Sequence, residues 1–153
     1  MLLHALSDYY TIKVNTKMIE VFGIQTATYW AMLIDITAPS PYKWGDACLV
    51  VFPDGQTMLI DSGVEAYGQI LVENLRRLGL EKLDYILFSH SHHDHCFGAL
   101  TEGGVLDSFP VGKIYWTGVR NTGWEDRYNI ENACQIRSIP LKIIRREDVL
   151  TFG

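Results

Sequence analysis

The clearest pattern of apolar and polar positions in this sequence spans residues 48–61. Two apolar, β-prone runs, Cys48–Phe52 and Thr57–Asp61, flank the tetrapeptide Pro53-Asp54-Gly55-Gln56. Proline presets the backbone angle φ, and Gly55 can adopt a left-handed conformation. These residues predict a β-hairpin.

The chain upstream of this hairpin is less regular. A strand is expected somewhere within Thr11–Phe22, and a second over Thr26–Ile36, which is rich in Thr, Tyr, Trp and Ile. Residues 38–45 contain two prolines, which prevent regular strand pairing, so we expect a loop there.

From Val64 onward the apolar positions recur at helical spacing. The residues that share one face are Tyr67, Ile70, Leu71, Leu75 and Leu78. Gly79 is expected to close this helix in the C′ position. The run Asp84–Ser89 is nearly all apolar, which predicts a strand buried on both faces.

Shorter elements are expected in the remainder of the chain. The predicted ranges are a helix around Cys96–Leu106, a strand at Lys113–Thr117, a helix at Asn129–Ser138 and a strand at Leu141–Ile144. Gly103 and Gly104 weaken the first of these helices. The alternation of strands and helices predicts an α/β layered fold, and residues 1–153 are expected to form part of a single domain.

Composition narrows the class of protein. The 153 residues are 48% hydrophobic and 20% charged, as in an ordinary globular protein. A net charge of -5 argues against a nucleic-acid-binding surface, which is usually basic. Three cysteines without paired spacing suit free thiols in a reducing compartment. We find no signal peptide and no membrane span, and expect a cytoplasmic protein.

The strongest candidates for metal ligands follow the strand predicted at Asp84–Ser89. In extended backbone, residues two apart point to the same side, so His90 and His92 can converge on one metal ion. Asp94 and His95 follow as the chain turns and offer donors to a second ion. Imidazole and carboxylate ligands suit zinc, and also iron or manganese.

The arrangement His90-x-His92-x-Asp94-His95 resembles the signature of the metallo-β-lactamase superfamily, whose fold is an αβ/βα sandwich. Other segments share the resemblance: Gly45-Asp46-Ala47, Leu59-Ile60-Asp61-Ser62-Gly63, Lys82-Leu83-Asp84-Tyr85-Ile86-Leu87, Phe109-Pro110-Val111 and Asp148-Val149-Leu150-Thr151-Phe152-Gly153. They are most similar to the branch of phosphorylcholine esterases and the hydrolase-like domains of DNA-uptake channels. The resemblance runs from about Gly45 to the end of the chain.

The resemblance implies a metal-dependent hydrolase. In such proteins two metal ions hold a hydroxide that attacks a carbonyl or phosphorus centre. It implies that His90 and His92 hold the first ion and that Asp94 and His95 hold the second. Asp94 would also position or deprotonate the water, which makes it the expected catalytic residue. Asp61 would lie beneath the site and orient a ligand, although it could instead only cap a turn.

The sequence departs from the family in one respect. The family completes its sites with two further histidines and an aspartate from the second half of the fold, whereas the only histidine here outside the cluster is His4. We therefore expect the N-terminal half of the sandwich. Its inner sheet face would be apolar, so we expect a homo-oligomer or a complementing chain.

Several residues have two possible roles. His93 points away from the other histidines and is expected to be structural or to lie at the edge of the site. Cys96 could be a further metal donor, but a small buried residue is the commoner case. The loop carrying Arg120, Trp124 and Arg127 could bind substrate, or be an ordinary solvated loop with an inward tryptophan.

The expected activity is cleavage of a small phosphoester or other ester. Two rival functions remain open. The chain could be a truncated or degenerate metal-binding module that acts only through association with a partner. It could also serve nucleic-acid processing if Arg120 and Arg127 line a channel for a single strand, although the acidic net charge argues against this.

Overall fold

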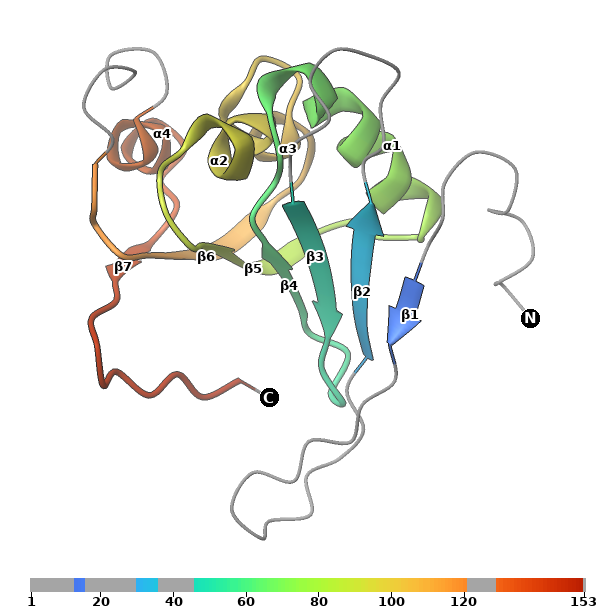
Figure 1. The fold of residues 1–153 in the computed structure, drawn as a ribbon, viewed down its shortest axis with the longest axis horizontal. Helices are drawn as coiled ribbons and strands as arrows, with labels where there is room; N and C mark the ends of the chain where they lie inside the picture. The colour runs from blue at the N-terminus through green and yellow to red at the C-terminus, as the bar shows by residue number, and fades with distance from the viewer. Residues whose placement is uncertain (1–12, 16–29, 36–45, 121–128, 153) are drawn as a thin grey trace, which may run out of the picture.

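A single seven-stranded sheet organises the described part of the chain (Figure 1). The computed structural model describes residues 13–15, 30–35, 46–120 and 129–152. The strands follow one another across the sheet in sequence order: β1 (Lys13–Asn15), β2 (Trp30–Asp35), β3 (Asp46–Val51), β4 (Thr57–Ile60), β5 (Leu83–Phe88), β6 (Val111–Trp116) and β7 (Leu141–Ile143). Neighbours are antiparallel from β1 to β4 and parallel from β4 to β7.

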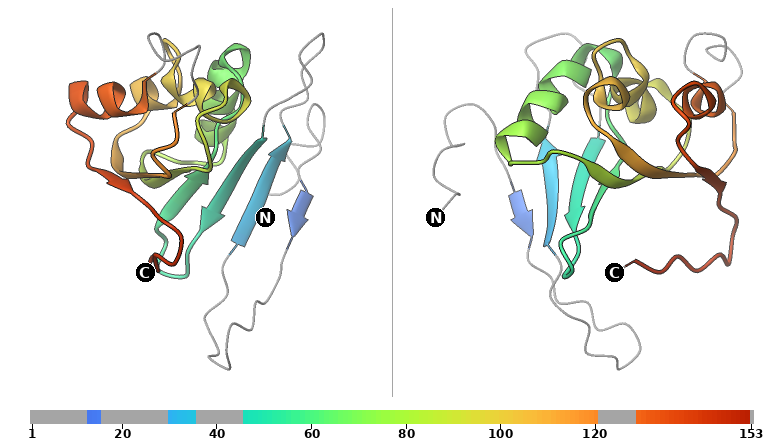
Figure 2. Two further views of the ribbon diagram at one scale, coloured as in Figure 1. Left: turned by 60° about the vertical axis from the view of Figure 1, so that its left-hand side comes forward. Right: turned by 180° about the vertical axis from the view of Figure 1, so that it is seen from behind.

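The helices gather on one side of this sheet (Figure 2). They are the short 3₁₀ helix η1 (Glu65–Tyr67), α1 (Gly68–Arg77), α2 (His93–Leu100), α3 (Val105–Ser108) and α4 (Ile130–Ile136). Their buried side chains form one core with the facing side of the sheet. The predicted α/β class is therefore confirmed. No helix within the described ranges is both long and apolar enough to cross a membrane.

The predicted hairpin is present between β3 and β4. The N–H of Phe52 donates to the carbonyl of Gln56 at 2.8 Å, and the N–H of Gly55 donates to the carbonyl of Phe52 at 2.9 Å. Gly55 has a φ of 86°, the left-handed angle expected of it. The local turn residues were sufficient to predict this element.

The helix expected after Val64 is also present, and it begins with a tighter turn. Tyr67 belongs to η1, and α1 ends at Arg77. Gly79 then adopts a φ of 83°, and the N–H of Leu80 donates to the carbonyl of Leu75 at 3.1 Å. This is the predicted glycine-terminated helix end.

The prediction for the next helix was wrong in its limits. Instead of one helix over Cys96–Leu106, α2 spans His93–Leu100, and the separate turn of α3 follows. The chain breaks between them because Gly103 has a φ of 69° and the N–H of Gly104 donates to the carbonyl of Thr101 at 2.9 Å. The first turn of α2, which contains Asp94, was not predicted because its residues are polar and show no helical pattern of apolar positions.

The remaining elements agree with the sequence within a few residues. Strands occur inside the two upstream ranges that were expected to contain them, although residues 38–45 lie outside the described part of the chain. The helix α4 begins after Asn129, whose side-chain oxygen accepts from the N–H of Asn132 at 3.0 Å. That bond is an ordinary N-cap.

Strand β5 was expected to be buried on both faces, and this is only half right. Ile86 and Phe88 are fully buried under the helices, whereas Tyr85 and Leu87 on the other face are half-buried. The reason is that no helix covers that second face in the described structure. The chain after β7 runs along it instead (Figure 1).

An aromatic cluster marks the place where this terminal segment meets the sheet. The ring of Phe152 stacks on Phe52, with centroids 5.1 Å apart. It also meets the edges of Tyr85 and Tyr115 at 4.9 and 5.6 Å. The face away from the helices is therefore partly apolar, and we call it the open face: Cys48, Val50, Met58, Ile60, Tyr85, Leu87 and Tyr115.

Helix α2 packs tightly against the loop after β4, and this contact yields a test of the fold. The N–H of Gly98 donates to the carbonyl of Gly63 at 2.9 Å, and a Cβ at Gly98 would overlap the carbonyl oxygen of Ser62. We expect Gly98→Ala to lower the free energy of unfolding by about 3 kcal/mol, because backbone would have to move. Urea denaturation measures the change.

The matched control is Gly55→Ala. A Cβ there meets nothing within 4 Å. The variant should therefore cost only the left-handed strain, roughly 1–2 kcal/mol. Equal losses in the two variants would contradict the close contact at Gly98.

Candidate metal centre

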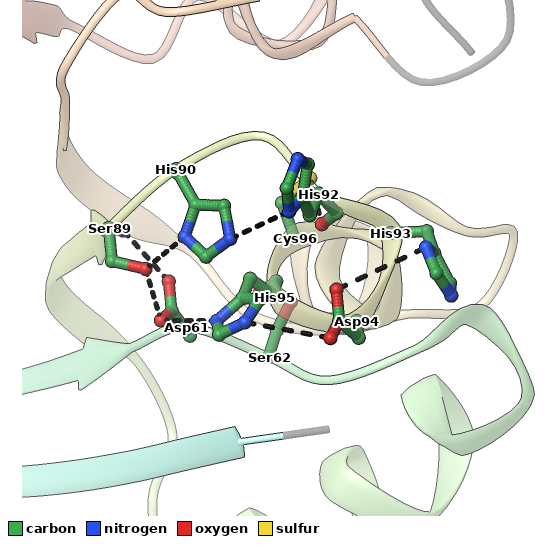
Figure 3. Close-up of polar contacts among 9 residues, drawn as sticks. All are labelled: Asp61, Ser62, Ser89, His90, His92, His93, Asp94, His95 and Cys96. Carbon is green, nitrogen blue, oxygen red and sulfur yellow. Dashed lines mark hydrogen bonds and ion pairs between the residues drawn. The ribbon is translucent and has the colours of Figure 1, made fainter. Parts of the chain in front are cut away.

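The histidine-rich segment lies where β4 and β5 end together. These two strands are parallel, and Asp61 follows β4 while Ser89 follows β5. The N–H of Asp61 still donates to the carbonyl of Leu87 at 2.9 Å, which continues the pairing beyond the strand. Because carboxyl ends of parallel strands meet at one edge of a sheet, side chains from both strands converge here (Figure 3).

Asp61 is the centre of the hydrogen bonding at this edge. Its residue is 5% exposed, and its φ of 56° is left-handed, which turns its side chain toward β5 and α2. The carboxylate accepts from the N–H of Ser89 at 2.8 Å and from the Ser89 hydroxyl at 2.6 Å. It lies 2.9 Å from Nδ1 of His95. Asp61 thus bonds Ser89 and His95 at once, and its expected role in orienting metal ligands stays a prediction.

His90 and His92 face each other above Asp61. Nε2 of His90 lies 3.1 Å from Nδ1 of His92, and their ring centroids are 4.6 Å apart. Two nitrogens bound to one tetrahedral zinc ion at about 2.0–2.1 Å lie roughly 3.3 Å from each other. The two imidazoles therefore already have the spacing that a shared ion requires.

Asp94 and His95 form a second pair of donors on the first turn of α2. Oδ2 of Asp94 lies 3.7 Å from Nε2 of His95, with the side chains 28% and 19% exposed. This pair adjoins the first, since the ring of His90 is 3.9 Å from that of His95. A carboxylate in the first helical turn is also favoured by the helix dipole.

The donors thus form two adjacent pairs. Within residues 13–15, 30–35, 46–120 and 129–152, no group of three or more His, Cys, Asp or Glu side chains is arranged to hold a metal ion. The chemistry of the donors fits a divalent metal, because two imidazoles adjoin an imidazole and a carboxylate. Each pair would supply only part of a coordination sphere.

Ser62 and Ser89 are two residues of the site that sequence reasoning missed. The carbonyl of His95 accepts from the N–H of Ser62 at 2.6 Å and from its hydroxyl at 3.1 Å. The Ser62 hydroxyl in turn accepts from the N–H of Ala99 at 2.9 Å. A small polar residue directly after Asp61, and another directly before His90, were the available signals.

The environment alters two ionisable groups of the segment. Partial burial lowers the pKa of His90, and the neighbouring rings of His95 and His92 lower it further. Burial raises the pKa of the Cys96 thiol to about 12. That thiol donates to the carbonyl of His92 at 3.4 Å and is fully buried, which agrees with the interpretation of Cys96 as a small core residue.

The other candidate residues belong to neither pair. His93 is on the outer side of α2, with Nδ1 at 4.0 Å from Asp94 and its ring near Phe97 (Figure 3). Arg120 forms an ion pair with Glu131 at the start of α4. Trp124 and Arg127, like His4, fall outside the described residues.

The sequence model of the Metallo-beta-lactamase superfamily matches residues 44–125, just over half of the chain. No curated protein matches the sequence.

Solved structures with a similar fold share little sequence. A mutant of the flavo di-iron protein from Thermotoga maritima superposes with a TM-score of 0.57 at 14% identity, over 91% of this chain and 34% of that one. A fragment of a diflavin flavoprotein from Nostoc gives a TM-score of 0.50 at 18% identity, over 94% and 54%. The chain thus spans about a third to a half of the length of these proteins.

The likeness to these structures shows the fold, and the matched segment contains both donor pairs and Asp61. This chain belongs to the metallo-beta-lactamase superfamily.

Proposed function

We propose that the chain carries the metal-binding part of a metal-dependent hydrolase that cleaves a phosphoester or another ester. The observation that carries the proposal is the presence of two adjacent donor pairs at one sheet edge. His90 and His92 form one pair, with 3.1 Å between facing nitrogens. Asp94 and His95 form the other, with 3.7 Å between facing atoms.

Each pair would hold one ion through the atoms that face each other. Nε2 of His90 and Nδ1 of His92 would bind the first ion. Oδ2 of Asp94 and Nε2 of His95 would bind the second. Zinc is the metal we propose, because nitrogen and carboxylate donors suit it, although the same donors also accept iron or manganese.

A divalent ion bound there would lower the pKa of water to about 7 and polarise the ester. The protein's own contribution is orientation. Asp94 has a second carboxylate oxygen, Oδ1, with which to accept a proton from an attacking water and hold it in place. Asp61 holds the ring of His95 at 2.9 Å and so keeps that ligand aimed at the site.

The preference for a phosphoester rests on the resemblance to the phosphorylcholine esterase branch, which is an argument from analogy. A cytoplasmic location is part of the same proposal, supported by three cysteines that are all free thiols.

A partner chain is also part of the proposal. The open face carries half-buried Tyr85 and Leu87 beside buried Tyr115, and the ring of Phe152 packs against the two tyrosines. An apolar sheet face of this kind is normally covered. We propose that a second copy of the chain, or a complementing chain, packs on it and completes the metal coordination.

The first prediction concerns the ligands. His92→Ala should weaken zinc binding at least about 100-fold, because one of the two donors of a pair is lost. Ser91→Ala is the matched control, because the Ser91 hydroxyl donates to the carbonyl of Val119 at 2.7 Å and touches neither donor pair, and it should bind zinc as the unaltered chain does. Titration with zinc against a chromogenic chelator measures both. Unchanged affinity in His92→Ala would show that the ligands are misassigned.

The second prediction concerns turnover. We expect the chain with zinc or manganese to hydrolyse bis(p-nitrophenyl) phosphate. A chelator should stop the hydrolysis, and added metal should restore it. Asp94→Asn should lower the rate by about 10²–10⁴, as loss of a proton acceptor does. Glu102→Gln, which removes a charge from an exposed position beyond α2, should leave the rate unchanged. Zinc binding without any turnover would instead support a non-catalytic metal-binding module.

The third prediction concerns assembly. Light scattering should give a mass of at least two chains, and Leu87→Lys on the open face should shift it toward one chain. Ile136→Lys is the control, because Ile136 is 70% exposed on α4 and away from that face. A monomeric mass for the unaltered chain would count against a partner on the open face.

A further inference from the structure

We propose that Ser89 is a positioning residue: together with Asp61 it fixes which nitrogen of His90 carries the proton. The same carboxylate also fixes which nitrogen of His95 carries the proton. One buried group therefore sets the tautomer of one histidine in each donor pair. The inference deepens the proposed function, because the tautomer of a histidine decides which nitrogen can bind a metal.

The first link is the carboxylate of Asp61. A carboxylate has no proton to donate, so each of its hydrogen bonds must be accepted. It accepts from the N–H of Ser89 at 2.8 Å and from the Ser89 hydroxyl at 2.6 Å. The shorter distance is that of a charge-assisted O–H···O⁻ bond.

The hydroxyl of Ser89 has a single proton, and Asp61 receives it. Ser89 Oγ is also 2.9 Å from Nδ1 of His90. With the hydroxyl proton already committed, Ser89 can only accept in this second bond, and Nδ1 of His90 must carry the proton. Nε2 of His90 then has the free lone pair.

That lone pair is on the ring nitrogen that faces His92. Nε2 of His90 is the atom 3.1 Å from Nδ1 of His92, inside the first donor pair. A neutral imidazole free in water has no such constraint, since either nitrogen can hold the proton. The Asp61–Ser89 link therefore selects the tautomer of His90 that binds through Nε2.

His95 is prepared by the same carboxylate without an intermediary. Its Nδ1 is 2.9 Å from Oδ2 of Asp61, so Nδ1 donates and Nε2 keeps its lone pair. Nε2 of His95 is the atom that faces Asp94 at 3.7 Å. One oxygen, Oδ2 of Asp61, thus governs His95 directly and His90 through Ser89.

The local structure makes Ser89 easy to test. Ser89 is exposed, and its backbone bond to Asp61 does not involve the side chain. Ser89→Ala therefore removes only the hydroxyl, and Ser89→Thr restores it. Ser91→Ala is a matched control, because the Ser91 hydroxyl donates to the carbonyl of Val119 at 2.7 Å and touches neither histidine pair.

The experiment is a long-range ¹H–¹⁵N correlation spectrum of the metal-free chain, which distinguishes the two tautomers of each histidine. In the unaltered chain we expect His90 and His95 to carry the proton on Nδ1. Ser89→Ala should release His90 into a mixture of tautomers while His95 stays on Nδ1. Ser89→Thr and Ser91→Ala should both keep the original pattern. The second readout is zinc affinity, which should fall about 10–100-fold in Ser89→Ala alone.

Two results would overturn the proposal. One is a His90 that carries its proton on Nε2 in the unaltered chain, a measurement that needs no variant. The other is a His90 that stays wholly on Nδ1 in Ser89→Ala. These spectra are recorded without metal or substrate. A chain that hydrolyses no ester could still show the expected tautomers, so the experiment tests the role of Ser89 independently of the proposed activity.

Discussion

The buried carboxylate of Asp61 joins the parts of the molecule on which the site depends. It sits at the end of β4, bonds the first residue after β5 and reaches His95 on α2. A buried charge is stable only when it is fully hydrogen-bonded, and here three donors satisfy it. One side chain therefore links the ends of both strands to the first turn of α2.

The sheet supplies the setting for this carboxylate, and its two faces differ. The helices bury one face and hold α2 above β4 and β5, whereas on the open face the ring of Phe152 packs against Phe52 and Tyr85. The chain spans about a third to a half of the similar solved structures. The two donor pairs lie at the carboxyl ends of β4 and β5, next to the helix-covered face.

Elements determined by neighbouring residues were predictable, and those determined by distant contacts were not. The turn at Gly55 and the helix end at Gly79 need only local backbone angles. The start of α2 was missed because His93, Asp94 and His95 are polar and carry no helical periodicity. Ser89 was missed because its partner lies 28 residues away, a separation that no local pattern reveals.

The separation between Asp61 and its partners also bears on how the chain folds. Residues 28 and 34 positions apart meet only after β4, α1 and β5 have assembled, and contacts of such long range form slowly. We therefore expect the arrangement of the donor pairs to form late in folding, after these elements have assembled. An ion that binds afterwards acts by mass action, adding about 2.7 kcal/mol at a hundredfold excess over its dissociation constant. Metal supply would then control how long the folded chain survives more than how fast it forms.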